Sequence, residues 1–216
     1  MIPLILIGGG AALAGWGLYK IFSSDDDSTS TPATIEIVKK LAILGPQGSG
    51  KTELWCALQG KPRTMRNTGV DLIKSFLLSQ TERVKVFIEE TKDIGGGDGY
   101  VERYGKLVSE ETFVYFLLDI TKIGREEYNM RPLAQLKTLL SLFPGSGEKS
   151  VHILATHIDE YRGDRLLGEK VVRDYLAPLE GYGYDRTKFG VTCVDLTNSN
   201  YIGKIKEEIL RSLPRK

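Results

Sequence analysis

Short apolar runs alternate with longer amphipathic segments from Ile35 onward. The apolar runs are rich in branched residues and predict strands at 40–44, 71–78, 84–89, 112–119, 151–155 and 189–194. The amphipathic stretches predict helices at 51–59, around 100–107, and at 131–142, 169–177 and 201–213. Alternation of this kind is typical of an α/β domain whose parallel sheet carries helices on both faces.

One pair of neighbouring strands breaks this alternation. The expected strands 71–78 and 84–89 are joined across Ser79-Gln80-Thr81-Glu82, which leaves no room for a crossover helix. We therefore expect an antiparallel hairpin at one edge of the sheet. The sequence predicts a doubly wound, mostly parallel sheet with one antiparallel edge strand, in a domain that spans residues 35–216.

The N-terminal segment has a different character. No charged side chain occurs from Met1 to Tyr19, and a run of about 20 apolar residues can span a bilayer as a helix. Trp16 and Tyr19 lie at one end, where aromatic rings favour the lipid–water interface. We expect a retained transmembrane helix over residues 1–22. A cleaved signal peptide, which would need a basic region before Ile2, and a buried core helix are the alternatives.

A polar segment separates this anchor from the domain, and the net charge of the chain bears on whether it binds nucleic acid. Residues 23–34 read SSDDDSTSTPAT, and their lack of large apolar side chains predicts a flexible linker. Lys and Arg total 29 and Asp and Glu total 28, so the formal net charge of the chain is +1. This balance argues against nucleic acid as the main partner.

The strongest chemical signal follows the first expected strand and opens the first expected helix. It matches GxxxxGK[ST] in full, with the residues Gly45, Pro46, Gln47, Gly48, Ser49, Gly50, Lys51 and Thr52. Glycines allow backbone N–H groups to turn inward around phosphate oxygens, and the helix N-terminus adds its dipole. We expect Lys51 to reach the β- and γ-phosphates and Thr52 to bind Mg²⁺. A glycine-rich turn that matches by chance is the alternative.

Three later segments fall in an order that narrows the class. Thr68 lies between the first helix and the hairpin, Asp93-Ile94-Gly95-Gly96 follows the strand 84–89, and Thr156-His157-Ile158-Asp159 follows residue 155. Together with the phosphate loop, they make the sequence resemble the Ras-like small GTPases over about residues 40–213. Within these GTPases the sequence also resembles, by analogy, the Arf and signal-recognition-particle-receptor β branch, whose β subunits carry an N-terminal membrane helix as well.

The resemblance implies roles for two switch segments. Thr68 would contact Mg²⁺ and the γ-phosphate, with Thr64 as its rival and an ordinary polar loop as the alternative. Asp93 would hold Mg²⁺ through water, and the N–H group of Gly96 would bond the γ-phosphate. Loss of that phosphate would release the loop and change the surface offered to a protein effector. A flexible glycine turn is the alternative for the second segment.

The resemblance also implies recognition of guanine. Thr156, His157 and Asp159 correspond to [NT]KxD, with His157 where lysine is usual. Asp159 would accept hydrogen bonds from the guanine N1–H and 2-amino groups, a donor pair that adenine lacks. His157 could pack over the base or could equally be an ordinary exposed loop residue. The fifth family element is matched only in position, by residues whose backbone would contact the base: Cys193, Val194 and Asp195.

The catalytic residues depart from the family pattern. Lys51 would stabilise charge on the phosphates, but Gly97 stands where relatives carry the glutamine that orients the attacking water. We therefore expect slow intrinsic hydrolysis. Asp98 is a candidate for holding the water, and Arg63 or Arg66 for an arginine finger in cis, although such arginines are more often solvated surface charges.

These expectations favour a membrane-anchored switch in the cytoplasm that binds GTP and GDP with Mg²⁺. A non-hydrolysing GTP-binding receptor or scaffold subunit is the first alternative, which Gly97 favours. A P-loop ATPase or kinase is the second alternative, and Asp159 argues against it.

Overall fold

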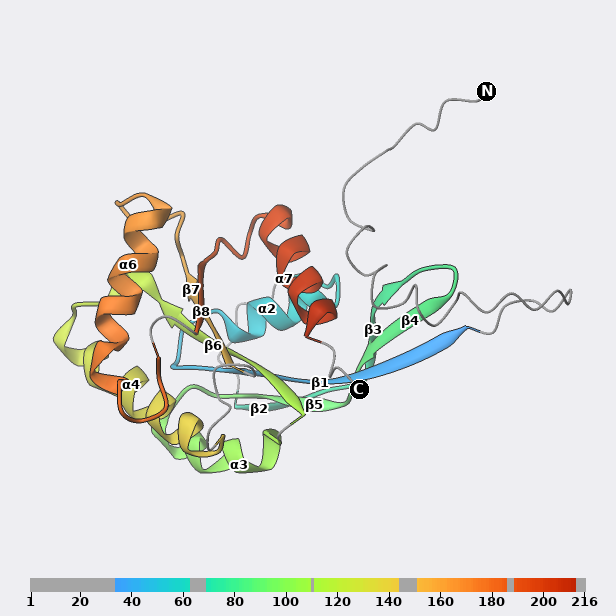
Figure 1. The fold of residues 1–216 in the computed structure, drawn as a ribbon, viewed down its shortest axis with the longest axis horizontal. Coiled ribbons are helices and arrows are strands. Elements are labelled where there is room, and N and C mark those ends of the chain that lie inside the picture. The colour runs from blue at the N-terminus through green and yellow to red at the C-terminus, as the bar shows by residue number, and fades with distance from the viewer. Residues whose placement is uncertain (1–33, 63–68, 110, 144–150, 186–188, 213–216) are drawn as a thin grey trace, which may run out of the picture.

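The computed structural model describes residues 34–62, 69–109, 111–143, 151–185 and 189–212 (Figure 1). The expected membrane helix at 1–22 and residues 23–33 of the expected linker lie outside the described residues. Thr64, Thr68, Arg63 and Arg66 lie outside them as well. Among the residues that are described, no helix combines the length and the apolar character needed to cross a bilayer.

A six-stranded sheet forms the centre of the domain (Figure 1). Its strands are, in spatial order, β3 (Phe76–Gln80), β4 (Val84–Ile88), β1 (Ile35–Leu44), β6 (Thr112–Asp119), β7 (Val151–Thr156) and β8 (Gly190–Cys193). All neighbours pair in parallel except β3 and β4, which are antiparallel. The mostly parallel sheet with an antiparallel edge strand is therefore confirmed.

Helices cover both faces of this sheet, as the alternating sequence pattern predicts (Figure 1). On one face, Leu41 and Ile43 of β1 pack in a cluster with α2 (Lys51–Leu58) and α7 (Ser199–Arg211). On the other face, Ala42 and Leu44 share a cluster with residues of three helices: α3 (Tyr104–Leu107), α4 (Glu126–Ser141) and α6 (Arg165–Leu176). Because successive strand residues point to opposite faces, one strand supplies both cores.

The expected antiparallel hairpin is present as β3 and β4, but the expected strand 71–78 is interrupted in its middle. β2 (Val70–Ile73) is separated from β3 by Lys74 and Ser75, and it pairs with β5 (Thr91–Ile94) as a separate antiparallel ribbon. A single strand over 71–78 is therefore wrong, and the sequence pattern misses β5. The break is stabilised locally, because the Ser75 hydroxyl donates to the Ile88 carbonyl at 2.8 Å.

Two helices begin earlier than the sequence pattern predicts. α4 starts at Glu126 rather than 131, so Pro132 lies inside the helix. α6 starts at Arg165 rather than 169, because the Asp164 side chain accepts a 2.7 Å hydrogen bond from the Leu167 N–H and caps the first turn.

A buried lysine fixes the end of α7 to β1. The ammonium group of Lys39 donates to the Ile209 carbonyl at 2.6 Å and lies 3.4 Å from the Leu210 carbonyl and 3.3 Å from the Ser212 hydroxyl. These acceptors lie at the C-terminal end of the helix, where its dipole also favours a cation. Burial lowers the pKa of Lys39 to about 8.

Candidate functional site

The phosphate loop connects β1 to α2 and has the backbone of an anion-binding turn. Gly45, Gly48 and Gly50 adopt φ values of 136°, 75° and 86°, which favour glycine. At Gly45 a Cβ atom would also lie 2.3 Å from the Leu117 carbonyl oxygen, so no larger residue fits there. Left-handed residues within such a loop bring successive N–H groups to one side, next to the N-terminus of α2.

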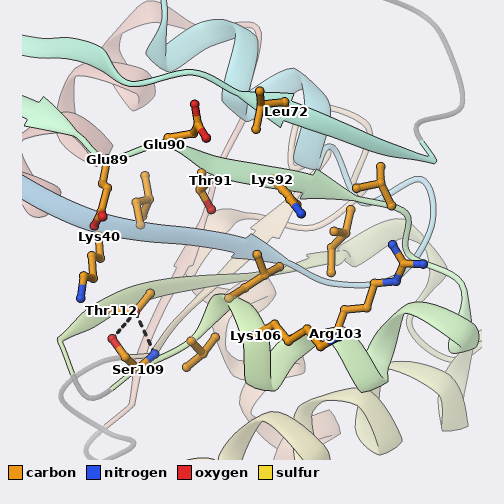
Figure 2. Close-up of a pocket in the computed structure, with 15 residues that line it drawn as sticks. Lys40, Leu72, Glu89, Glu90, Thr91, Lys92, Arg103, Lys106, Ser109 and Thr112 are labelled. Atoms are coloured by element: carbon orange, nitrogen blue, oxygen red, sulfur yellow. Dashed lines mark hydrogen bonds between the residues drawn. The ribbon is translucent and has the colours of Figure 1, made fainter.

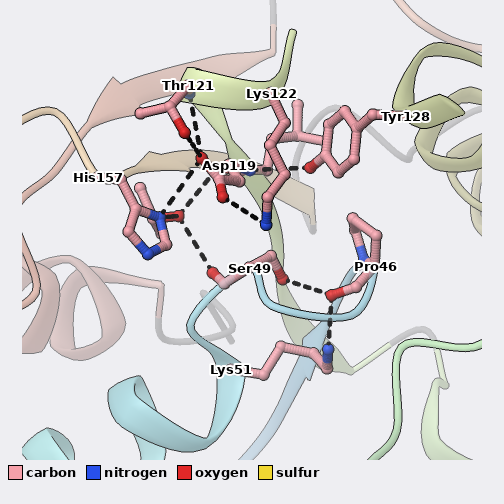
Figure 3. Close-up of polar contacts among 10 residues, drawn as sticks. Pro46, Ser49, Lys51, Asp119, Thr121, Lys122, Tyr128 and His157 are labelled. Carbon is pink, nitrogen blue, oxygen red and sulfur yellow. Dashed lines mark hydrogen bonds and ion pairs between the residues drawn. The ribbon is translucent and has the colours of Figure 1, made fainter. Parts of the chain in front are cut away.

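One carbonyl group organises the polar side chains of this loop. The Pro46 oxygen accepts from Lys51 Nζ at 2.8 Å and from Ser49 Oγ at 2.9 Å (Figure 3). Lys51 is 7% exposed, and burial lowers its pKa to about 8, against the opposing effect of the Asp93 carboxylate. The ammonium group is thus held at the loop in an environment that would favour an anionic ligand.

The structure brings together two of the three residues expected to hold a metal. Thr52 at the start of α2 donates from Oγ1 to Asp93 Oδ2 at 2.6 Å, and Asp93 in β5 is 1% exposed. A hydroxyl and a carboxylate are oxygen ligands of the kind that Mg²⁺ takes, with phosphate and water oxygens completing six. These residues therefore fit a Mg²⁺–polyphosphate group, while Thr68 lies outside the described residues.

Gly96 lies directly against the phosphate loop. A Cβ atom at this position would be 2.1 Å from both the Gln47 nitrogen and the Pro46 carbonyl carbon. The Gly96 carbonyl accepts from Gln135 Nε2 of α4 at 3.0 Å, and Gln135 is buried. The segment after β5 therefore contacts both the phosphate loop and α4. A movement of the phosphate loop would displace this segment.

The two residues after Gly96 have open surroundings. Among the described residues, a Cβ atom at Gly97 would meet only the Tyr100 ring, at 3.7 Å, and the backbone has φ −74° and ψ 160°. Asp98 begins the short helix η1 (Asp98–Arg103), is exposed, and pairs with Arg131 Nε of α4 at 3.1 Å. The carboxylate proposed to hold a water thus has a partner on α4.

Thr156 joins the expected base-recognition segment to the phosphate loop. Its hydroxyl is fully buried and lies 3.1 Å from the Ser49 carbonyl, 3.0 Å from the Leu118 carbonyl and 2.9 Å from His157 Nδ1. His157 has a left-handed φ of 62°, and Asp159, two residues later, is exposed at the surface. A carboxylate in that position is accessible to a ligand.

The segment after β8 lies beside the 156–159 segment. Val194 N–H donates to the Ala155 carbonyl at 2.8 Å, and its carbonyl accepts from Ile158 N–H at 3.4 Å. Cys193 is buried, and the Asp195 carboxylate accepts from the Thr197 N–H at 2.7 Å. The residues expected from their position to flank the base are therefore adjacent to the 156–159 segment.

A polar cluster at the end of β6 was not predicted. Asp119 Oδ1 accepts from the Thr121 N–H at 3.0 Å and its hydroxyl at 2.7 Å, Oδ2 lies 2.8 Å from Lys122 Nζ, and His157 Nδ1 lies 3.7 Å from Oδ1 (Figure 3). The Asp119 N–H donates to the Tyr128 hydroxyl at 2.9 Å. Burial opposes ionisation of Asp119, but these donors outweigh it and hold its pKa below the ordinary value. The available sequence signal is a pair of charged residues at and just after the carboxyl end of a buried parallel strand, Asp119 and Lys122.

A cavity of about 530 Å³ lies elsewhere, between β1, the β2–β5 ribbon and α3 (Figure 2). Its charged lining comprises Lys40, Glu89, Glu90, Lys92, Arg103 and Lys106. Ile94, two residues before Gly96, also lines it. The cavity is therefore separate from the phosphate loop, and β5 contributes to its lining.

Comparison with solved structures identifies the fold. The Roco2 RocCORdC protein of Methanosarcina barkeri, solved with GDP, matches with a TM-score of 0.52 and 20% identity, over 88% of this chain and 53% of that chain. The chain thus spans about half the length of that relative. Toc33 from Arabidopsis thaliana, in complex with Mg²⁺ and GMPPNP, matches with a TM-score of 0.57 and 10% identity, over 83% of this chain and 85% of that chain.

A dimerization-deficient mutant of Toc33 aligns at a TM-score of 0.60 and 10% identity, over 93% of this chain and 88% of that chain. No protein-family model matches the sequence, and no curated protein matches it. At these identities the likeness is one of fold, and the fold is that of a small-GTPase-like P-loop domain. The resemblance found in the sequence motifs is confirmed at that level.

Proposed function

We propose that the chain is a guanine-nucleotide-binding protein that uses Mg²⁺ and hydrolyses GTP slowly. The observation that carries the proposal is the 2.6 Å hydrogen bond from Thr52 to Asp93, beside the phosphate loop. It joins a helix and a distant strand at the point where Mg²⁺ would bridge the protein and a nucleotide. Two structural neighbours, solved with GDP and with Mg²⁺ and GMPPNP, support the same ligand class.

Asp159 supports guanine rather than adenine as the base. Its exposed carboxylate follows β7, on the segment that Thr156 ties to Ser49. An acid in this place favours a base with two neighbouring N–H donors, because an adenine would leave the carboxylate without them. A P-loop ATPase or kinase would bind adenine, which gives Asp159 no pair of N–H donors to accept from.

Nucleotide competition tests the proposal. Fluorescent GDP is bound in Mg²⁺ and displaced by GDP, GTP or ATP. We expect GDP and GTP to compete, and ATP to compete at least about a hundredfold less well. Asp159→Ala should weaken guanine-nucleotide binding by about tenfold or more, while Glu160→Ala, which removes an exposed acid next to it, should not. Effective competition by ATP, or no binding of guanine nucleotide by folded protein, would contradict the proposal.

Slow hydrolysis follows from Gly97, which offers no side chain to orient a water. Single-turnover phosphate release distinguishes a slow GTPase from the alternative of a non-hydrolysing receptor or scaffold subunit. A measurable rate that depends on Mg²⁺ supports the GTPase. No phosphate release, either alone or with added membrane extract, favours the scaffold.

Membrane attachment through residues 1–22 is part of the proposal and is supported by their sequence. With GTP as the ligand, the domain would face the cytoplasm, and the loops around Gly96 would present the nucleotide state to a protein partner. The full chain should remain with membranes after extraction at alkaline pH. Deletion of residues 1–22 should release it, and release of the full chain would contradict the anchor.

A further inference from the structure

An ammonium group reaches the phosphate loop from an element that the family motifs do not include. Lys122 ends the short helix η2 (Ile120–Lys122), directly after β6. A Cβ atom built on Gly48 would meet Lys122 Nζ at 3.1 Å, so the cation lies against the loop. Figure 3 shows the side chain extending from the end of β6 toward Ser49 and Pro46.

Asp119 holds this lysine in place. Its Oδ2 atom lies 2.8 Å from Lys122 Nζ, while Oδ1 is engaged by the hydroxyl of Thr121. The Asp119 side chain is 5% exposed and the Lys122 side chain 34% exposed. An ion pair this well covered is screened less than a surface pair, and its geometry is more restricted.

His157 does not itself present a free cation to the loop. Its Nδ1 atom lies 2.9 Å from the Thr156 hydroxyl and 3.7 Å from Asp119 Oδ1. The ring is therefore directed at protein groups, and Asp119 lies between the histidine and Lys122. The Asp119 carboxylate thus lies between His157 of the base-recognition segment and the Lys122 ammonium group, which lies beside Gly48.

We infer that Lys122 is a nucleotide-positioning residue that replaces the lysine missing at position 157. Held by Asp119 against Gly48, its ammonium group fixes the phosphate loop relative to the 156–159 segment and adds positive charge beside a polyphosphate. The inference rests on the proposed function, because it concerns the same nucleotide site. The ligand it serves is a guanine nucleotide with at least two phosphates.

The test compares three variants with wild type. Lys122→Met removes the charge and keeps the length, Lys122→Arg keeps a cation, and Lys122→Met/His157→Lys supplies an ammonium from the neighbouring segment. Lys204→Met, on the exposed side of α7, is the matched control for loss of one charge. The measured quantities are the Kd and dissociation rate of fluorescent GDP, and urea unfolding without nucleotide.

Lys122→Met should raise the Kd by about tenfold or more, mainly through faster dissociation, because it removes the positive charge that lies beside Gly48. Lys122→Arg should stay within about threefold of wild type, and the double variant should recover most of the lost affinity. Lys204→Met should bind as wild type does.

The outcomes separate the inference from the proposed function. If wild type binds no guanine nucleotide, the proposed function fails and the inference with it. If wild type binds and Lys122→Met binds equally well, only the inference fails. It also fails if Lys122→Met loses affinity in proportion to a loss of unfolding free energy and His157→Lys restores neither.

Discussion

Lys51 should take up a proton when a nucleotide binds near pH 8. Burial lowers its pKa to about 8, so about half of the molecules carry a neutral amine at that pH. A polyphosphate next to the amine favours its charged form and raises the pKa again. The expected uptake is about 0.5 proton per nucleotide at pH 8, about 0.1 at pH 7 and about 0.9 at pH 9.

Isothermal titration calorimetry measures this uptake directly. GDP with Mg²⁺ is titrated into the protein at each pH, in buffers of small and large ionisation enthalpy. The slope of the observed enthalpy against the buffer ionisation enthalpy gives the number of protons exchanged. Apparent affinity should also fall as pH rises above 8, because the amine must first be protonated.

Two arginine variants control the measurement. Lys51→Arg stays charged at every pH used, so its binding, even if weaker, should show no proton uptake from this position. Lys39→Arg replaces a lysine of β1 whose pKa is also about 8 but whose ammonium group contacts the end of α7, and uptake should remain as in wild type. Equal heats in both buffers at pH 8 for wild type would refute the reasoning, as would uptake that persists in Lys51→Arg.

Three further predictions follow from single positions. Gly97→Gln should raise single-turnover GTP hydrolysis by on the order of a hundredfold over Gly97→Ala, because the site has room and lacks a water-orienting side chain; equal rates would contradict this. Gly96→Ala should weaken GDP binding at least about tenfold in displacement titrations, since its Cβ would lie 2.1 Å from the Gln47 nitrogen. For Lys39→Met, urea unfolding should show wild type gaining stability relative to the variant from pH 8 to about 10.5. Across that window the unfolded lysine binds a proton that the folded one has lost, and a difference independent of pH would count against it.

The strands that could be predicted from the sequence are those in which most side chains are apolar and buried in the core. The expected strand 112–119 agrees with β6 in full because almost all of its residues are buried. β5 could not be predicted, because Thr91-Lys92-Asp93-Ile94 contains one large apolar residue and is ordered by its pairing with β2. Local pattern thus identifies central strands better than a ribbon defined by tertiary pairing.

The phosphate loop could be read from the sequence because its residues are contiguous and its glycines are required by backbone geometry. The Thr52–Asp93 contact was accessible only through the order of motifs, since the two residues come from different elements. The short helix η2 offered no motif, and nothing in the chain order places Lys122 next to Gly48. That contact depends on β1 and β6 being neighbours in the sheet.

A histidine at position 157 suggests, from the sequence alone, a weakened base site. The structure changes that inference, because electrostatics depends on where a charge lies and not on which segment carries it. Since Asp119 contacts Lys122 and faces His157, the end of β6 can supply a cation that the 156–159 segment lacks. It follows that affinity for nucleotide should respond more to Lys122 than to His157. His157→Ala should therefore cost less binding than Lys122→Met, an order that the motif alone would reverse.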